Sequence, residues 1–133
     1  MQLASKNAWS LGFIVILLFI ILSELSFFFG EYLFHRLGIS RNLVLILLWG
    51  LPLLAAFLTS YYAREHKLIL GLSFLLIVPL LGTAAHYSNW KIGAAVDFGG
   101  VSGAIAILKI YFVINSLLVL IGTGLGLLLS KTK

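Results

Sequence analysis

The stretch "WSLGFIVILLFIILSELSFFF", from Trp9 to Phe29, decides the fold, because Glu24 is the only charge in an otherwise apolar run. A helix needs about 20 apolar residues to cross the hydrocarbon core of a bilayer. The run is longer than the apolar core of a signal peptide and lacks a small-residue cleavage site. We therefore predict a first membrane-spanning helix that is retained in the mature protein.

Three further stretches have the length and composition of a spanning helix, so that the four spans cover residues 9–29, 42–62, 68–85 and 104–129. Over all 133 residues, 62% are hydrophobic and only 10% are charged, which is typical of membrane proteins. The sequence predicts an all-α integral membrane protein with one domain, residues 1–133. Its four helices form an antiparallel up-down bundle, with a glycine-rich loop between the third and the fourth.

Four spans place both termini on one side of the membrane. Basic residues favour the cytoplasmic side, and the side of the termini carries more of them. We expect both termini in the cytoplasm and the protein in the cytoplasmic (inner) membrane of a prokaryote. The basic residues on the side of the termini are Lys6, Arg64, Lys67, Lys131 and Lys133, and those on the opposite side are Arg36, Arg41 and Lys91.

Several function classes are excluded by what the chain lacks. The net charge of +5 comes from basic residues that flank apolar runs, so it indicates contact with lipid headgroups, and we expect no nucleic-acid partner. The chain has no cysteine, no HExxH pair, no GxSxG elbow and no Walker lysine loop. We expect no catalytic site, no metal and no cofactor. A lipid-modifying activity that uses His86 or Asp97 is the alternative.

Two charged residues, Glu24 and Lys109, lie inside predicted spans. The first and fourth helices run in opposite directions, which brings the two residues to a similar depth. Charged side chains within a span usually face the bundle interior and find partners there. We predict an ion pair between them. In one alternative Lys109 extends to the headgroups and Glu24 is protonated or hydrated. In another, Glu24 couples to a proton or cation.

Polar residues recur at every seventh position of the fourth span, which is typical of a seam that faces a partner helix. Gly122 and Gly126 form a small-xxx-small pair that allows close approach. We expect this seam to pack against helices, with the lining of a permeation path as the alternative. The seam consists of Ser102, Lys109, Ser116, Thr123 and Ser130, flanked by Asn115, Gly122 and Gly126.

Pro52 and Pro79 lie inside the second and third spans. Each proline removes one intrahelical hydrogen bond and bends its helix. Such kinks are ordinary in membrane helices, and the alternative is that the two together open a cleft on the side opposite the termini. The expected lining residues are Trp49, Thr83 and His86.

A polar cluster is expected on the membrane face opposite the termini. Glu31 and His35 are one helical turn apart, so their side chains can meet. The glycine-rich loop, residues 93–103, brings Asp97 toward them, together with His86. We predict a solvated loop over this face, with a surface for a ligand or a partner protein as the alternative.

Together these features favour a non-enzymatic accessory, regulatory or immunity-type subunit of a membrane complex. Such a protein recognises other membrane helices within the lipid bilayer, as a homo-oligomer or in a larger complex. The first alternative is a small proton- or cation-coupled transporter or channel subunit that uses Glu24. The second is a lipid-modifying membrane enzyme.

Overall fold

The computed structural model describes residues 2–92 and 100–131. In chain order the helices are α1 (Ser5–Glu31), the π-helix η1 (Tyr32–Arg36), α2 (Arg41–Tyr62), α3 (Lys67–Leu72), α4 (Phe74–Lys91) and α5 (Gly100–Lys131). The described residues contain four helical segments long and apolar enough to cross a membrane, with α3 and α4 together forming the third. They include no strand. The predicted all-α fold with four spans is confirmed.

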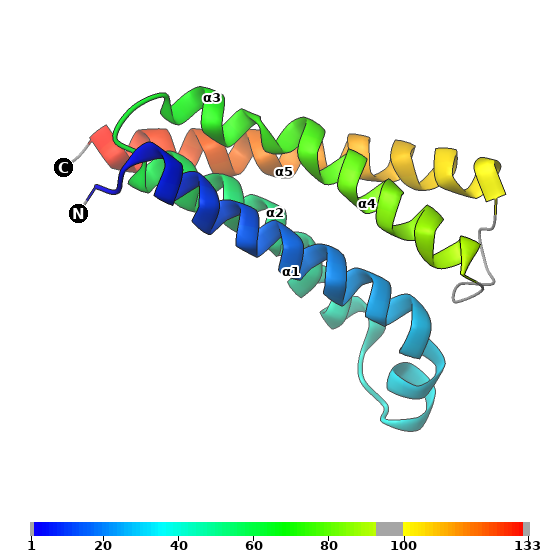
Figure 1. The fold of residues 1–133 in the computed structure, drawn as a ribbon. Helices are drawn as coiled ribbons and strands as arrows, with labels where there is room; N and C mark the ends of the chain where they lie inside the picture. The colour runs from blue at the N-terminus through cyan, green and yellow to red at the C-terminus, as the bar shows by residue number, and fades with distance from the viewer. Residues whose placement is uncertain (1, 93–99, 132–133) are drawn as a thin grey trace.

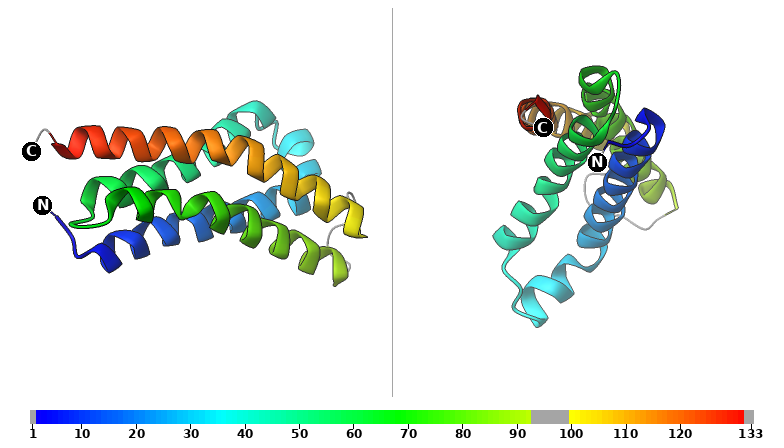
Figure 2. Two further views of the ribbon diagram at one scale, coloured as in Figure 1. Left: turned by 90° about the horizontal axis from the view of Figure 1, so that it is seen from above. Right: turned by 90° about the vertical axis from the view of Figure 1, so that its left-hand side faces the viewer.

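The helices form two antiparallel pairs, α1 with α2 and α4 with α5 (Figure 1). Both ends of the chain lie at the end of the molecule where α2, α3 and α5 pack together. Toward the other end the two pairs move apart, so that the molecule is V-shaped (Figure 2). The sequence predicts the pairing but not this divergence.

Glycines allow the helices to approach closely at the narrow end. A Cβ atom on Gly122 would lie 2.3 Å from the backbone oxygen of Leu53, and one on Gly126 would lie 2.7 Å from that of Phe57. A Cβ atom on Gly12 would lie 2.1 Å from the Thr59 hydroxyl. In lipid, helices associate through such close packing, because the hydrocarbon tails are as apolar as the side chains. These glycines fix α1 and α5 against α2.

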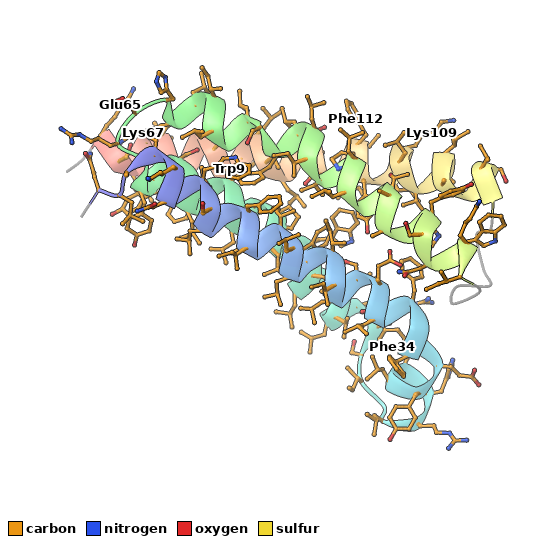
Figure 3. All side chains as sticks on the ribbon, in the orientation of Figure 1. Trp9, Phe34, Glu65, Lys67, Lys109 and Phe112 are labelled. Carbon is orange, nitrogen blue, oxygen red and sulfur yellow. The ribbon has the colours of Figure 1, made fainter. Side chains whose placement is uncertain are left out.

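The third span is divided at Ser73, which ends α3 and precedes α4. Its hydroxyl donates a hydrogen bond to the carbonyl of Leu70 (2.6 Å) and accepts one from the indole N–H of Trp9 (3.0 Å). Trp9 projects from α1 in Figure 3. From α5, the side-chain amide of Asn115 donates to the carbonyl of Phe74 at 3.2 Å. Both α1 and α5 therefore hydrogen-bond to the third span at the junction of α3 and α4.

The two prolines do not interrupt their helices. Pro52 is buried within α2, which runs continuously from Arg41 to Tyr62, and Pro79 is buried within α4. The break in the third span lies at Ser73, six residues before Pro79. A serine that bonds to the preceding turn competes with the helical hydrogen bonds, and the Trp9 contact holds it in that arrangement.

Candidate functional site

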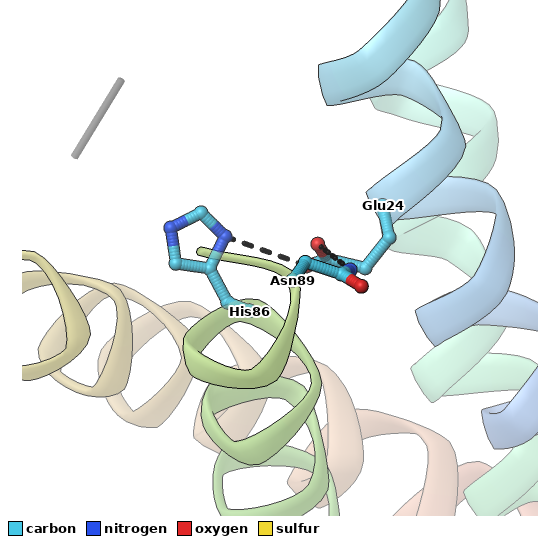
Figure 4. A network of polar contacts seen from close by, with 3 residues as sticks. All are labelled: Glu24, His86 and Asn89. Atoms are coloured by element: carbon cyan, nitrogen blue, oxygen red, sulfur yellow. Dashed lines mark hydrogen bonds and ion pairs between the residues drawn. The ribbon is translucent and has the colours of Figure 1, made fainter. Parts of the chain in front are cut away.

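Glu24 lies inside the molecule, where the two helix pairs begin to diverge. It is 7% exposed and accepts a hydrogen bond from the side-chain amide of Asn89, at 2.7 Å from Oε2. The Nδ1 atom of His86 is 3.5 Å from Oε1 of the same carboxylate. Figure 4 shows both contacts, with Glu24 on α1 and its two partners on α4. We call Glu24, His86 and Asn89 the buried polar cluster.

The local helix geometry explains why these side chains meet. His86 and Asn89 are three residues apart on α4, so they share one face. The ring of Phe27, three residues after Glu24 on α1, packs against the His86 imidazole with 5.5 Å between centroids. His86 is 1% exposed and is among the most buried side chains of the described structure. The cluster thus ties α1 to α4 at a distance from the narrow end of the V.

Several polar atoms of this region have no hydrogen-bond partner among the described residues. They are Oε1 of Glu24, both ring nitrogens of His86 and the hydroxyl of Thr83. The separation of 3.5 Å between His86 and Glu24 suits an ion pair when the imidazole is protonated, but is long for a good hydrogen bond. Unsatisfied buried groups are uncommon and costly. This set can bind a proton, a small cation or a hydrogen-bonding ligand.

A second group of side chains surrounds the cluster on the side of α2 and α5. Tyr111 of α5 is buried, and its side chain lies close to Ser23 and Glu24 of α1. Its ring packs against Trp49 and Phe19, at centroid distances of 5.6 and 5.9 Å. Ser23 and Glu24 are consecutive in α1, so one faces this aromatic group and the other faces α4.

A cavity of about 260 Å³ lies beside this aromatic group, between α1, α2 and α5. Its wall is mostly apolar, and its polar side chains are Ser23, Ser26, Trp49, Tyr111 and Arg41. This cavity is not the predicted cleft, since neither Pro52 nor Pro79 lines it. Trp49 lines this cavity, whereas Thr83 and His86 lie on the α4 side and are not part of its wall.

The predicted partner of Glu24 is wrong. Lys109 is exposed, and Glu24 instead contacts Asn89 and His86. The reason is the rotation of α5 about its axis. Lys109 lies two residues from Ile107 and from Tyr111, which are both buried. Two residues turn an α-helix by about 200°, so Lys109 lies on the opposite face.

The buried face of α5 also differs from the predicted seam. It repeats every fourth residue, through Gly103, Ile107, Tyr111, Asn115, Val119 and Thr123, with Gly122 and Gly126 beside it. Four residues turn the helix by about 400°, so this face winds around α5 by about 40° per step. Of the predicted seam, Thr123 and the flanking Asn115, Gly122 and Gly126 are buried on or beside this face. Ser102 is exposed, and the hydroxyls of Ser116 and Ser130 donate to carbonyls of their own helix.

The predicted outer cluster does not form one site. Glu31 and His35 are exposed on α1 and η1, whereas His86 is buried against Glu24. Asp97 lies outside the described residues. Because α1 and α4 diverge toward this end, His86 is separated from the residues that follow Glu31.

Sequence reasoning missed Asn89, Tyr111 and Ser23. Asn89 follows His86 by three residues, so helical spacing alone could have placed the amide beside the imidazole. Tyr111 follows Ile107 by four residues on the face that turned out to be buried. No feature of the sequence distinguished Ser23 from the other serines, since serine is common in membrane helices.

The described residues hold no group of three side chains that could bind a metal ion. The fold and the buried polar cluster define the class, a small four-span α-helical membrane protein with charged groups inside its bundle. No protein-family model matches the chain, and no curated protein or solved structure with which it was compared matches it.

Proposed function

We propose that this protein is a non-enzymatic subunit of a larger membrane complex, and that it binds its partner along α4 and α5. One observation carries this proposal. Lys109 is exposed on the apolar surface of α5 and has no acidic partner among the described residues. It projects from α5 on the side away from α1 (Figure 3).

The depth of Lys109 makes its lack of a partner significant. It lies five residues inside the predicted span, 104–129, which is about 8 Å along a helix axis. A lysine costs about 2.5–3.5 kcal/mol at the centre of a span on translocon scales, and this cost falls toward the ends of the span. The nearest intramembrane acid of this chain, Glu24, is already bound by Asn89 and His86. An acidic residue on another membrane helix would offset this cost.

The surface around Lys109 suits a helix. A shallow groove of about 400 Å³ runs between α4 and α5, and its wall is apolar apart from this lysine. An apolar helix face can lie in such a groove, with one acid opposite Lys109 to set its register. The groove is lined by Leu76, Pro79, Leu80, Leu108, Lys109, Phe112 and Val113.

Co-isolation from the native membrane tests this proposal. Lys109→Leu should lose the partner, because the acid opposite it would then be unpaired in hydrocarbon, whereas Lys109→Arg should keep it. Lys91→Leu is the matched control, since it removes the same charge from the exposed end of α4. A partner that remains bound to Lys109→Leu at the wild-type level would contradict the proposal and favour a lysine that reaches the headgroups.

A second function has its own support. The unsatisfied atoms of Glu24, His86 and Thr83 favour a proton- or cation-coupled transporter or channel subunit, because they lie together inside the bundle. Reconstituted protein should then show a flux that depends on pH and that Glu24→Gln abolishes. Ser26→Ala is the control, since this hydroxyl bonds only to the carbonyl of Leu22 on its own helix. A pH-independent flux, or none, would count against this function.

We also propose that the protein lies in the cytoplasmic membrane of a prokaryote, with both termini in the cytoplasm. The end that holds the two termini is rich in basic residues, and such residues are retained on the cytoplasmic side. Arg64 lies in the turn between α2 and α3, where its backbone bonds to the N-terminal segment, and Lys67 begins α3.

A further inference from the structure

We propose that the cavity between α1, α2 and α5 binds one acyl chain of a phospholipid with a negatively charged headgroup, and that Arg41 pairs with the headgroup. This site lies on the side of the molecule away from the α4–α5 groove. It therefore does not depend on the proposed partner helix.

The wall of the cavity suits a hydrocarbon chain. Six of its thirteen lining residues are branched aliphatic side chains of α2 and α5, and Phe27, Phe34, Trp49 and Tyr111 add aromatic surface. Trp49 lies eight residues after Arg41 on α2, toward the inner end. Its volume of about 260 Å³ is below the range of about 300–1,000 Å³ that is usual for drug-sized ligands, so it has room for part of one acyl chain and not for two. The aliphatic lining residues are Val44, Leu45, Leu48, Ile107, Ile110 and Ile114.

The mouth of the cavity suits a negatively charged headgroup. Arg41 lines the cavity, is exposed and opens α2, whose start lies at a predicted membrane boundary. Its guanidinium lies 5.6 Å from the ring centroid of Phe34, another lining residue. Among the described residues Arg41 has no acidic partner. A planar guanidinium with free donors is well suited to bind a phosphate oxygen pair.

The charges and the lining together decide the kind of ligand. An uncharged lipid would fill the apolar wall but leave Arg41 unpaired, and a free phosphate would pair with Arg41 but leave the wall unfilled. A phosphatidylglycerol-like lipid satisfies both parts. The bilayer supplies such lipids at high local concentration, and basic residues at the surface attract them.

Trp49 offers a direct test, because it lines the inner end of the cavity. The other two tryptophans are replaced by phenylalanine (Trp9→Phe and Trp90→Phe), so that the fluorescence reports on Trp49 alone. The protein is reconstituted in vesicles whose phosphatidylglycerol or phosphatidylcholine carries brominated acyl chains, which quench nearby indoles. We expect brominated phosphatidylglycerol to quench Trp49 at least twofold more strongly than brominated phosphatidylcholine at equal content.

Arg41→Gln should remove this preference, and Arg36→Gln should leave it intact. Arg36 is the matched control, since it is an exposed arginine of the same connection but does not line the cavity. Equal quenching by the two lipids, or an unchanged preference in Arg41→Gln, would overturn the proposal.

Native mass spectrometry gives a second readout that needs no tryptophan replacement, which matters because Trp9 bonds to Ser73. From an equimolar lipid mixture, the wild-type protein should retain phosphatidylglycerol several-fold more than phosphatidylcholine. Arg41→Gln should retain both equally. Equal retention by the wild-type protein would contradict the proposal.

Discussion

Glu24 has two partners, both supplied by α4, and together they account for the burial of a carboxylate inside a membrane bundle. Asn89 bonds to one carboxylate oxygen and His86 lies 3.5 Å from the other. An ion pair in a low-dielectric interior need not stabilise a fold, because desolvation offsets the Coulomb attraction. Such a pair can nevertheless select which faces of α1 and α4 meet.

Removal of the carboxylate should therefore destabilise the bundle. We expect Glu24→Ala to lower the free energy of unfolding by about 1–3 kcal/mol, because it leaves Asn89 and His86 buried without their partner. Ser26→Ala, two residues further along α1, should change it by less than about 0.5 kcal/mol, because that site is partly exposed and its hydroxyl bonds only within its own helix. Unfolding in mixed detergent micelles measures both variants. Equal stability of Glu24→Ala and the wild-type protein would contradict a structural role for the cluster.

The residue-level site was only partly predictable. Depth could be read from the chain, and it placed Glu24 within the first candidate spanning segment, which the structure describes as a helix. The rotation of each helix about its own axis could not be read from the chain, because a nearly uniform apolar span gives little indication of which face points inward. Lys109 was therefore paired with Glu24 by depth, although it lies on the opposite face of α5 from the buried Ile107 and Tyr111.

At the level of the helices, the closest packing is between α5 and α2. Gly122 and Gly126 lie against backbone oxygens of α2, where a side chain has no space. Gly124 lies between them in sequence, and a Cβ atom there would meet nothing within 4 Å. The three glycines of one helix thus form a natural comparison.

We expect Gly122→Ala to destabilise the protein by about 1–3 kcal/mol, the usual cost of overpacking, since its Cβ atom would lie 2.3 Å from the Leu53 oxygen. Gly124→Ala should be neutral or stabilising by up to about 1 kcal/mol, because alanine favours the helix. The same unfolding measurement compares the two variants. Similar effects of both substitutions would show that α5 does not pack on α2 in this way.

The helix boundaries were predicted to within four residues except at the end of the third span, which was predicted at 85 whereas α4 continues to Lys91. The edges of a span are set by where charges and glycines begin. The first span was predicted at 9–29 and the helix runs over Ser5–Glu31. The division of the third span at Ser73 was not predicted. It depends on a hydrogen bond from Trp9, which comes from another helix and has no counterpart in the local sequence.

At the level of the whole molecule, the four-span architecture followed from hydropathy alone, whereas the V shape did not. The two pairs are held together by glycine contacts at one end and by the buried polar cluster further along. Both are long-range contacts that depend on helix rotation. The cavity beside Tyr111 exists because the pairs diverge, so it too could not be read from the sequence.

The orientation in the membrane can be measured cleanly, since the chain has no natural cysteine. We expect Ile39→Cys, between η1 and α2, to react with a membrane-impermeant maleimide in intact cells, because this end should face outward. Lys131→Cys, at the end of α5, should react only after the cells are permeabilised. The reverse pattern, or equal labelling at both sites, would contradict the predicted orientation.

Site-specific photocrosslinking in the native membrane tests the central proposal most directly. A photoreactive amino acid at Val113, which lines the α4–α5 groove and is 65% exposed, is compared with one at Ile14, which is 61% exposed on α1. We predict that Val113 forms an adduct with one protein whose span carries an acidic residue, that Lys109→Leu abolishes this adduct, and that Ile14 does not form it. Lipid adducts alone at both positions, or a protein adduct indifferent to Lys109, would contradict a partner site on α4 and α5.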